Sequence, residues 1–338
     1  MRVSVFRGAA AGVGLAALLL TCSACATGTA ADQGAASAPR PTATGAAPAA
    51  TAYTPYVSAT TAADTDAAGS PDTYNLAFVV ADGDACTPLW GGTAAADDSA
   101  VVARVAALTA SGADVRVSFG GAAGTEAALA CDSARELADA YGDVLDAVGA
   151  TKADFDIEGD ALTDTASVAR RNEALHLLQQ ERDLDVTYTL PVMPDGLEAS
   201  GRAVLDDAVT RDVEVSAVNI MAMNYSSSHD GDMSDYAEQA ASAAHDQVAD
   251  VFGLPDDEAW RALHITVMIG VNDVAGETFT RADAASLRSF ARREGVGALS
   301  LWAAFRDRQC TGEDTTKAGD TCSGVEQEDG AFAEALGG

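Results

Sequence analysis

Lysine is almost absent from this sequence of 338 residues, which contains only Lys152 and Lys317. The 20 basic residues are outnumbered by 51 acidic ones, so the formal net charge is −31 at pH 7. An acidic surface of this kind repels phosphate backbones, and we therefore expect no nucleic-acid partner. The charge favours solubility and says little about the fold.

Histidine is also scarce, and the Cys-x-x-Cys spacing of Cys22 and Cys25 lies close to the N-terminus. The four histidines are scattered along the chain: His176, His229, His245 and His264. Zinc sites are typically built from closely spaced pairs of Cys and His, and the rest of the chain has no such pairs. We expect no metal ion and no cofactor.

Long apolar runs are missing too. The stretch GAAAGVGLAALLL follows Arg2 and Arg7, is too short to cross a bilayer comfortably, and precedes the small residues of TCSACA. This order is typical of a secretory signal peptide, so we predict a signal peptide over residues 1–25 and a secreted, extracellular protein. The alternative is a membrane-anchored lipoprotein with its lipid on Cys25 or Cys22. Ala24 suits that processing, whereas Cys22 is a poor match to the leucine usual at that position.

Residues 26–52 are rich in Ala, Thr, Pro and Gly and show no apolar periodicity. Such a segment cannot bury enough surface to offset the entropy of ordering, so we predict a flexible linker. Residues 53–338 have a suitable length for one large domain, and we expect a monomer.

Four cysteines lie in this domain: Cys86, Cys131, Cys310 and Cys322. An even number in an exported chain indicates disulfides. Sequence order favours the pairs Cys86–Cys131 and Cys310–Cys322 among the three connectivities that four cysteines allow.

Short β-like runs alternate with amphipathic helical segments along the domain. Eight strands are predicted, at residues 53–59, 74–81, 114–121, 153–159, 185–192, 215–225, 264–271 and 297–303. Helices are predicted at 98–112, 132–149, 164–182 and 280–295, whereas the first connection, before residue 74, resembles a loop. Eight such units predict an α/β fold, a (β/α)8 TIM barrel forming a single catalytic domain.

The stretch KADFDIEGD places Asp154, Asp156 and Glu158 at every second position, with Phe155 and Ile157 between them. In a strand this period sends the three carboxyls to one face and the two apolar side chains to the other. One interpretation is a solvated edge strand with an acidic face. The other is functional, because the C-terminal ends of barrel strands converge on one mouth, where active sites lie.

Unusual residues end other predicted strands and would meet these acids: Gly120, Gly121, Met221, Met223, Asn224, Tyr225 and Trp302. The deepest acid, Asp154, is expected to share a proton or hydrogen bond with Asp156, which orients what lies above it. Glu158, nearest the mouth, is expected to keep a raised pKa and to act as a general acid. Trp302 offers a flat floor for a sugar ring, although a core role is an equal alternative.

The remaining predicted site residues are assigned more simply. Gly120 and Gly121 either let substrate approach closely or form a tight strand exit. Tyr225 can donate a hydrogen bond to a carbonyl, or it is a core phenol. Met221, Met223 and Asn224 are assigned to substrate binding, together with Trp302 and the two glycines.

The motifs VSFGG, DFDIEG, VNIMAMNY and LSLWAAFRDRQC, in this order, resemble the secreted bacterial chitinases of glycoside hydrolase family 18. The resemblance also includes AFVVADGDACTPLWGG, RRNEAL, YTLPVMPDGL and MIGVNDV, so it extends through nearly all of residues 53–336.

The resemblance implies hydrolysis of β-1,4 bonds between N-acetylglucosamine units of chitin or its oligosaccharides, with retained anomeric configuration and without a metal. In this mechanism the substrate's own acetamido oxygen attacks the anomeric carbon while Glu158 protonates the leaving oxygen. Asp156 would hold the acetamido N–H, Asp154 would support Asp156, Tyr225 would bind the acetamido oxygen, and Trp302 would form the sugar platform.

Three positions depart from the family pattern. Thr151 stands at the first Asp of Asp-x-x-Asp-x-Asp-x-Glu, Asn224 stands where an Asp is usual, and Ser58 replaces an acid of the first strand. An amide at position 224 can still hydrogen-bond a sugar, but it cannot tune Glu158 by charge.

Other functions remain open from the sequence. A chitin-binding lectin would keep the barrel and lose catalysis, although such proteins usually lack the acid present here as Glu158. An endo-β-N-acetylglucosaminidase would use the same residues. A calcium site is disfavoured, since that ion takes six to eight oxygens, usually from one loop.

Overall fold

A computed structural model describes residues 50–311 and 319–338. The predicted signal peptide, with Cys22 and Cys25, and all but the last three residues of the predicted linker lie outside this range. Over the described residues, no helix has the length and apolar character needed to span a membrane.

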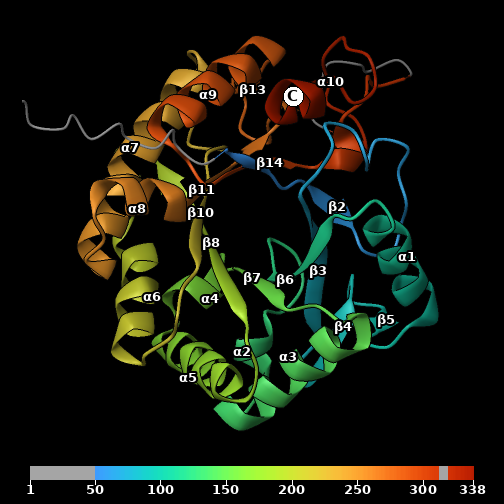
Figure 1. Cartoon of the computed structure of the whole chain (residues 1–338), viewed down its shortest axis with the longest axis vertical. Helices are drawn as coiled ribbons and strands as arrows, with labels where there is room; N and C mark the ends of the chain where they lie inside the picture. Colours follow the sequence, from blue (N-terminus) through green and yellow to red (C-terminus); the bar gives the residue numbers. More distant parts are fainter. Residues whose placement is uncertain (1–49, 312–318) are drawn as a thin grey trace, which may run out of the picture. The chain divides into compact units, whose positions relative to one another are not determined.

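The centre of the domain is a closed ring of mostly parallel strands surrounded by helices (Figure 1). The first ring position is shared by two short strands, β1 (Ala52–Tyr53) and β2 (Tyr56–Ser58). The others are β3 (Thr73–Asp82), β6 (Asp114–Gly120), β7 (Lys152–Asp156), β8 (Asp185–Met193), β10 (Ala217–Met221), β11 (Leu263–Met268) and β14 (Ala298–Trp302). These are the eight predicted strand positions, so the predicted (β/α)8 barrel is confirmed.

The ring closes through the interrupted first strand. β1 pairs in parallel with β14, whereas β2 pairs in parallel with β3. Between them lies Pro55, which has no N–H to offer to a neighbouring strand. The chain changes partners at this point: the Thr54 N–H donates to the oxygen of Leu299, and the oxygen of Pro55 accepts from the Asn75 N–H.

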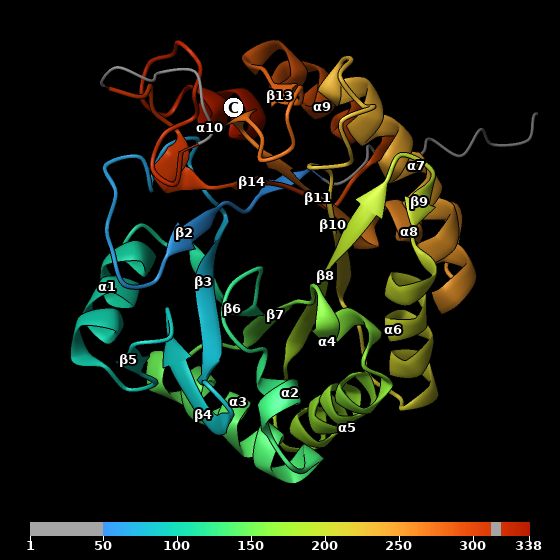
Figure 2. The same cartoon turned by 180° about the vertical axis from the view of Figure 1, so that it is seen from behind.

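Helices cover the outside of the ring, as Figure 2 shows from behind. The four predicted helices are present as α1 (Ser99–Thr109), α3 (Ala134–Val148), α5 (Thr165–Glu181) and α9 (Arg281–Glu294). Two further helices, α6 (Ala199–Thr210) and α7 (Met233–Phe252), were not predicted. The first connection, residues 59–72, contains turns and no helix, as predicted. Shorter helices are α2 (Ala127–Ala130), α4 (Asp160–Thr163), α8 (Asp256–Ala262) and α10 (Ala331–Gly337).

Both predicted disulfides are present. Cys86 lies on β4 (Ala85–Trp90), which forms an antiparallel hairpin with β3, and its bond to Cys131 ties this hairpin to the end of α2. Cys310 pairs with Cys322 after the last barrel strand.

The alternation predicted for residues 153–159 divides that strand between two environments. Phe155 points away from the barrel axis into the layer under the helices, where its ring lies 5.3 Å from Phe119 and 5.1 Å from Tyr141. Ile157 is fully buried as well. The acids between them therefore face the barrel interior, which rules out the solvated edge strand.

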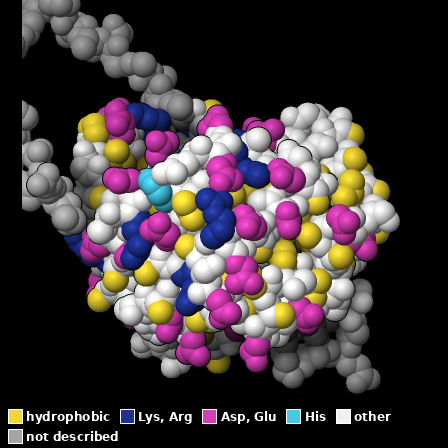
Figure 3. Space-filling view, turned by 90° about the horizontal axis from the view of Figure 1, so that it is seen from below, with side chains coloured by type: hydrophobic (Ala, Val, Ile, Leu, Met, Phe, Trp, Pro, Cys, Tyr) yellow, Lys and Arg dark blue, Asp and Glu magenta, His cyan; other side chains and the backbone are white. Residues whose placement is uncertain are grey.

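The surface is mixed in sign despite the large net charge. On the face seen in Figure 3, acidic side chains are scattered among basic ones. Exposed ion pairs such as Arg135–Glu181, at 2.7 Å, connect neighbouring helices. Pairs of this kind are expected to contribute only about 0–1 kcal/mol each, so packing of the ring and helices stabilises the fold.

Gly120 tests how tightly β6 approaches β7. It has φ of 100°, and an added Cβ would lie 2.1 Å from the backbone oxygen of Asp156. We expect Gly120→Ala to lower the free energy of unfolding by more than about 2 kcal/mol in urea titrations. The control is Gly149→Ala, a helix-end glycine with φ of 67° and open space around its Cβ, which should cost about 1 kcal/mol. Equal losses would contradict this account.

Candidate active site

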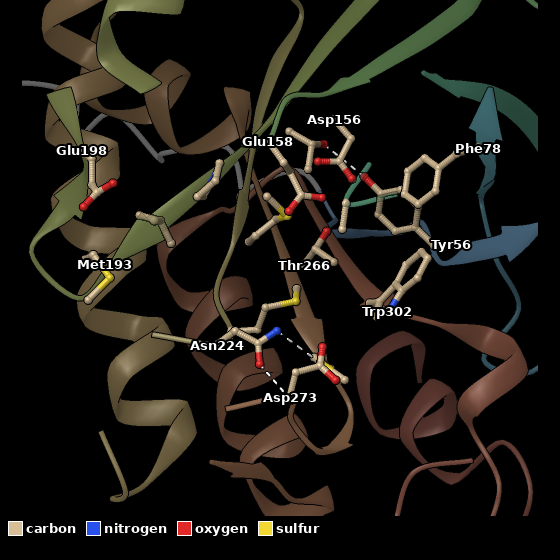
Figure 4. Close-up of a pocket in the computed structure, with 17 residues that line it drawn as sticks. Tyr56, Phe78, Asp156, Glu158, Met193, Glu198, Asn224, Thr266, Asp273 and Trp302 are labelled. Atoms are coloured by element: carbon tan, nitrogen blue, oxygen red, sulfur yellow. Dashed lines mark hydrogen bonds between the residues drawn. The ribbon is translucent and has the colours of Figure 1, made fainter. Parts of the chain in front are cut away.

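The acid row on and after β7 leads to the mouth of the barrel, where Figure 4 shows Asp156 and Glu158. Asp154 and Asp156 are almost completely buried, with 1% and 4% of their surface exposed, whereas Glu158 is only partly buried. The row thus ascends from the barrel interior towards solvent, as the strand period predicted.

Asp154 is held by three hydroxyl groups from three different strands. Its Oδ2 accepts from Tyr56 at 2.9 Å and from Ser118 at 2.5 Å, and its Oδ1 accepts from Thr189 at 2.6 Å. The predicted hydrogen bond between Asp154 and Asp156 is wrong, because the partners of Asp154 are these three hydroxyls and do not include Asp156. Burial raises the pKa of Asp154, and the three hydroxyls oppose this rise.

Asp156 is buried, yet one of its carboxyl oxygens lacks a hydrogen-bond donor among the described residues. Its Oδ1 is buried and accepts no hydrogen bond from any described residue. Burial raises the pKa of Asp156 well above its ordinary value, and the nearby charges of Glu158 and then Asp154 raise it further. The carboxyl therefore has an oxygen available for a donor that enters the cavity.

Glu158 combines access with a perturbed proton affinity. Burial raises its pKa above the ordinary value, as predicted. A carboxyl whose pKa is raised and that faces a cavity is suited to act as a general acid.

These acids open into a cavity of about 310 Å³, within the range of small-ligand sites. Of the predicted site residues, it is lined by Asp156, Glu158, Met221, Met223, Asn224 and Trp302. Four of the six methionines of the sequence contribute to it, which gives the cavity a soft apolar wall.

One side of the cavity is aromatic. The ring of Trp302 stacks on Phe78 at 5.4 Å and meets Tyr56 edge-on at 5.9 Å. Tyr56 also donates to Asp154, so the same residue supports the aromatic side and the acid row. The predicted position of Trp302 at the barrel mouth is confirmed, and its ring gives the cavity an aromatic surface against which a sugar ring can pack.

Asn224 lies on the opposite edge and anchors a loop. Its Oδ1 accepts from the backbone N–H groups of Asp273 at 2.9 Å and Val274 at 3.2 Å. Among the described residues, its Nδ2 donates only to the sulfur of Met268, at 3.6 Å, and can therefore also donate to a ligand.

Tyr225 is not brought to the cavity, which corrects its predicted place there. The strand period ends before this residue, because β10 ends at Met221 and Asn224 adopts φ of 54°. The phenol is buried beside His229 and Tyr236, and its oxygen has no hydrogen-bond partner among the described residues.

Gly120 and Gly121 are not among the lining residues either. Both have positive φ, and a Cβ on Gly121 would lie 2.9 Å from the ring of Phe78. The structure thus accounts for both glycines by the tight strand exit. Ser58 lies outside the lining, where its hydroxyl accepts from the Thr61 N–H at 3.0 Å.

Sequence reasoning missed several lining residues: Tyr56, Phe78, Thr189, Met193, Glu198, Thr266, Met268 and Asp273. Tyr56, Phe78 and Thr189 lie in predicted strands, so the alternation of side chains along those strands could have indicated that they face the barrel interior. Glu198 and Asp273 lie on loops, where no sequence pattern indicates which way a side chain points. Among the described residues, no group of three or more His, Cys, Asp or Glu side chains is placed to hold a metal ion.

The chain is similar to known chitinases. Over 275 residues it is 34% identical to "Probable bifunctional chitinase/lysozyme" of Escherichia coli and to "Endochitinase 11" of Metarhizium anisopliae. The match covers 75% of this chain but 31% and 52% of those proteins, so the chain spans about a third and about half the length of the curated relatives it matches. No family model matches the sequence.

The fold of the chain is also similar to that of a solved chitinase structure. The catalytic domain of a hyperthermophilic chitinase from Pyrococcus furiosus superposes with a TM-score of 0.74 at 26% identity, over 86% of this chain and 95% of that one. Together with the parallel barrel and the acids at its mouth, this similarity identifies the chain as a glycoside hydrolase. With these relatives, the chain belongs to glycoside hydrolase family 18.

The raised pKa of Asp156 predicts an effect on stability. The folded state binds this proton more tightly than the unfolded state, so the free energy of unfolding falls as pH rises from the ordinary pKa of 3.8 through the folded pKa. The Asp156→Asn variant has no carboxyl at this position and therefore does not lose this stability. Its melting temperature should be about 2 °C or more above that of the unmodified protein at about pH 7, and the difference should vanish near about pH 3. Calorimetry tests this, with the exposed Asp143→Asn on α3 as control. A lower melting temperature for Asp156→Asn at neutral pH would contradict it.

Proposed function

We propose that this chain is a secreted chitinase that hydrolyses β-1,4 bonds between N-acetylglucosamine units of chitin or its oligosaccharides. The observation that carries the proposal is the pair at the barrel mouth: Glu158, an accessible acid with a raised pKa, and Asp156, with a buried oxygen that accepts no hydrogen bond. A mutant of the Pyrococcus furiosus chitinase has been solved with chito-oligosaccharides, which supports the same substrate class here.

The geometry suits a retaining, substrate-assisted reaction. With one ring on Trp302, the proton of Glu158 passes to the glycosidic oxygen while the acetamido oxygen of the same sugar bonds to the anomeric carbon. The leaving sugar departs, and water then opens the oxazolinium ion while Glu158 takes back a proton. Two displacements at one carbon leave its configuration unchanged.

Asp156 is well placed for two tasks. Its free Oδ1 can accept the acetamido N–H, which turns the acetamido oxygen towards the anomeric carbon. Its negative charge stabilises the positive charge that develops on the oxazolinium ion, an interaction strengthened by burial. Asp154 and its three hydroxyl donors act behind it by placing β7 and fixing a second negative charge below the site.

Export belongs to the same proposal. Two disulfides suit an oxidising compartment outside the cytosol. The order of charges, apolar residues and small residues in 1–25 supports a signal peptide, with a lipid anchor on Cys25 or Cys22 as the alternative. We propose a monomeric catalytic domain over residues 53–338.

Glu158→Gln tests the role of the acid. The amide keeps the size of the side chain but has no acidic proton to transfer, so kcat on N-acetylglucosamine oligomers should fall by at least about 100-fold while binding is retained. Binding is measured by calorimetry and turnover by chromatography. In the unmodified enzyme, anomer-resolved product analysis should show the β-anomer first, and an α-anomer would exclude the retaining mechanism.

The acetamido group is tested from the substrate's side. An oligomer whose reacting ring carries a free amine has no acetamido oxygen to attack the anomeric carbon, so it should be cut at least about 100-fold more slowly than its acetylated counterpart. Rates are compared under single-turnover conditions with the same enzyme preparation. Equal rates would show that water or an enzyme carboxylate attacks directly.

A further inference from the structure

Glu198 lies at the end of the cavity opposite the aromatic side. Figure 4 shows Glu198 and Met193 on one side, Trp302, Phe78 and Tyr56 on the other, and Glu158 between them. Glu198 precedes α6 and its side chain is exposed, yet it lines the cavity. A sugar chain that crosses Glu158 with one ring on Trp302 therefore brings its next ring towards Glu198.

The lining of the cavity is rich in carboxyl groups and contains no basic side chain among the described residues. Its lining includes the carboxyls of Asp156, Glu158, Glu198 and Asp273, and none of the described lining residues is Lys, Arg or His. The buried Oδ1 of Asp156 adds an acceptor that no described residue uses. The lining thus favours a ligand that brings donors and positive charge.

Two of these acids, Glu198 and Asp273, are exposed at the rim of the cavity, and they differ in whether a basic side chain lies nearby. Burial lowers the pKa of Arg306, and the nearby charge of Asp273 opposes this, so Asp273 has a basic neighbour. Glu198 forms no ion pair with any described residue. Its charge is therefore available to a cation that enters from solvent.

We propose that Glu198 determines specificity for partially deacetylated chains by favouring a glucosamine unit, with its ammonium group, on the leaving side of the cleaved bond. The inference rests on the proposed function, because the acetamido mechanism requires an N-acetyl group on the reacting ring and leaves the neighbouring ring free to carry an amine. The preferred bond joins an N-acetylglucosamine to a following glucosamine.

The size of the effect follows from the exposure of Glu198. A solvent-exposed pair of charges contributes modestly, so the preference in kcat/KM should be about two- to five-fold. It should shrink when the salt concentration rises to about 0.5 M, since screening weakens exposed pairs. It should also disappear at a pH above the pKa of the sugar amine, where the ammonium group loses its charge.

The test uses partially acetylated chitosan as substrate and mass-spectrometric sequencing of the products. The unmodified enzyme should produce new reducing ends that are N-acetylated and new non-reducing ends that are enriched about two- to five-fold in glucosamine over the starting chain. Glu198→Gln should abolish this enrichment. Asp195→Asn is the matched control, because it removes an exposed carboxylate from the same loop, outside the cavity, and should leave the enrichment in place.

The outcomes separate the two proposals. New non-reducing ends without glucosamine enrichment, or enrichment that survives Glu198→Gln, would overturn the role of Glu198 while chitinase activity stands. New reducing ends that carry free amines as often as the starting chain would instead overturn the acetamido mechanism.

Discussion

Burial of carboxylates inside a closed ring of strands is the constraint on which the site depends. Asp154 and Asp156 lose nearly all contact with water, and each meets that cost differently. Asp154 receives three hydroxyl hydrogen bonds, whereas Asp156 has a buried oxygen without a donor. The ring holds both because every strand that borders β7 is fixed by parallel pairing on its other side. A less closed sheet would let water reach these acids and return their proton affinities to ordinary values.

The fold and the centre of the site were predictable from local patterns. A period of two over residues 153–159 assigned three acids to one face, and eight alternating strand and helix signals assigned that face to the barrel interior. Trp302, Met221, Met223 and Asn224 could be placed for the same reason, since strand ends meet at one mouth. Both disulfide pairs also followed from chain order, because each cysteine of the domain is bonded to the next one along the chain, Cys86 to Cys131 and Cys310 to Cys322.

What could not be predicted depends on backbone turns and on contacts between distant strands. Tyr225 was assigned to the cavity by continuing a strand period that stops at Met221, and the positive φ of Asn224 turns the phenol towards α7 instead. The donors to Asp154 come from positions 36, 35 and 98 residues away, so no local pattern links them. Glu198 is a single acid on a loop in a chain rich in acids, and only the three-dimensional structure distinguishes it from the others.

The interrupted first strand has a consequence for how the molecule assembles. β1 and β2 come earliest in the described chain, yet one of them pairs only with β14, about 245 residues later. The ring can close only after β14 has been synthesised, so shorter nascent chains carry an open sheet edge that invites wrong strand pairing. The cavity and the ring are thus completed by the same strand, since Trp302 lies on β14.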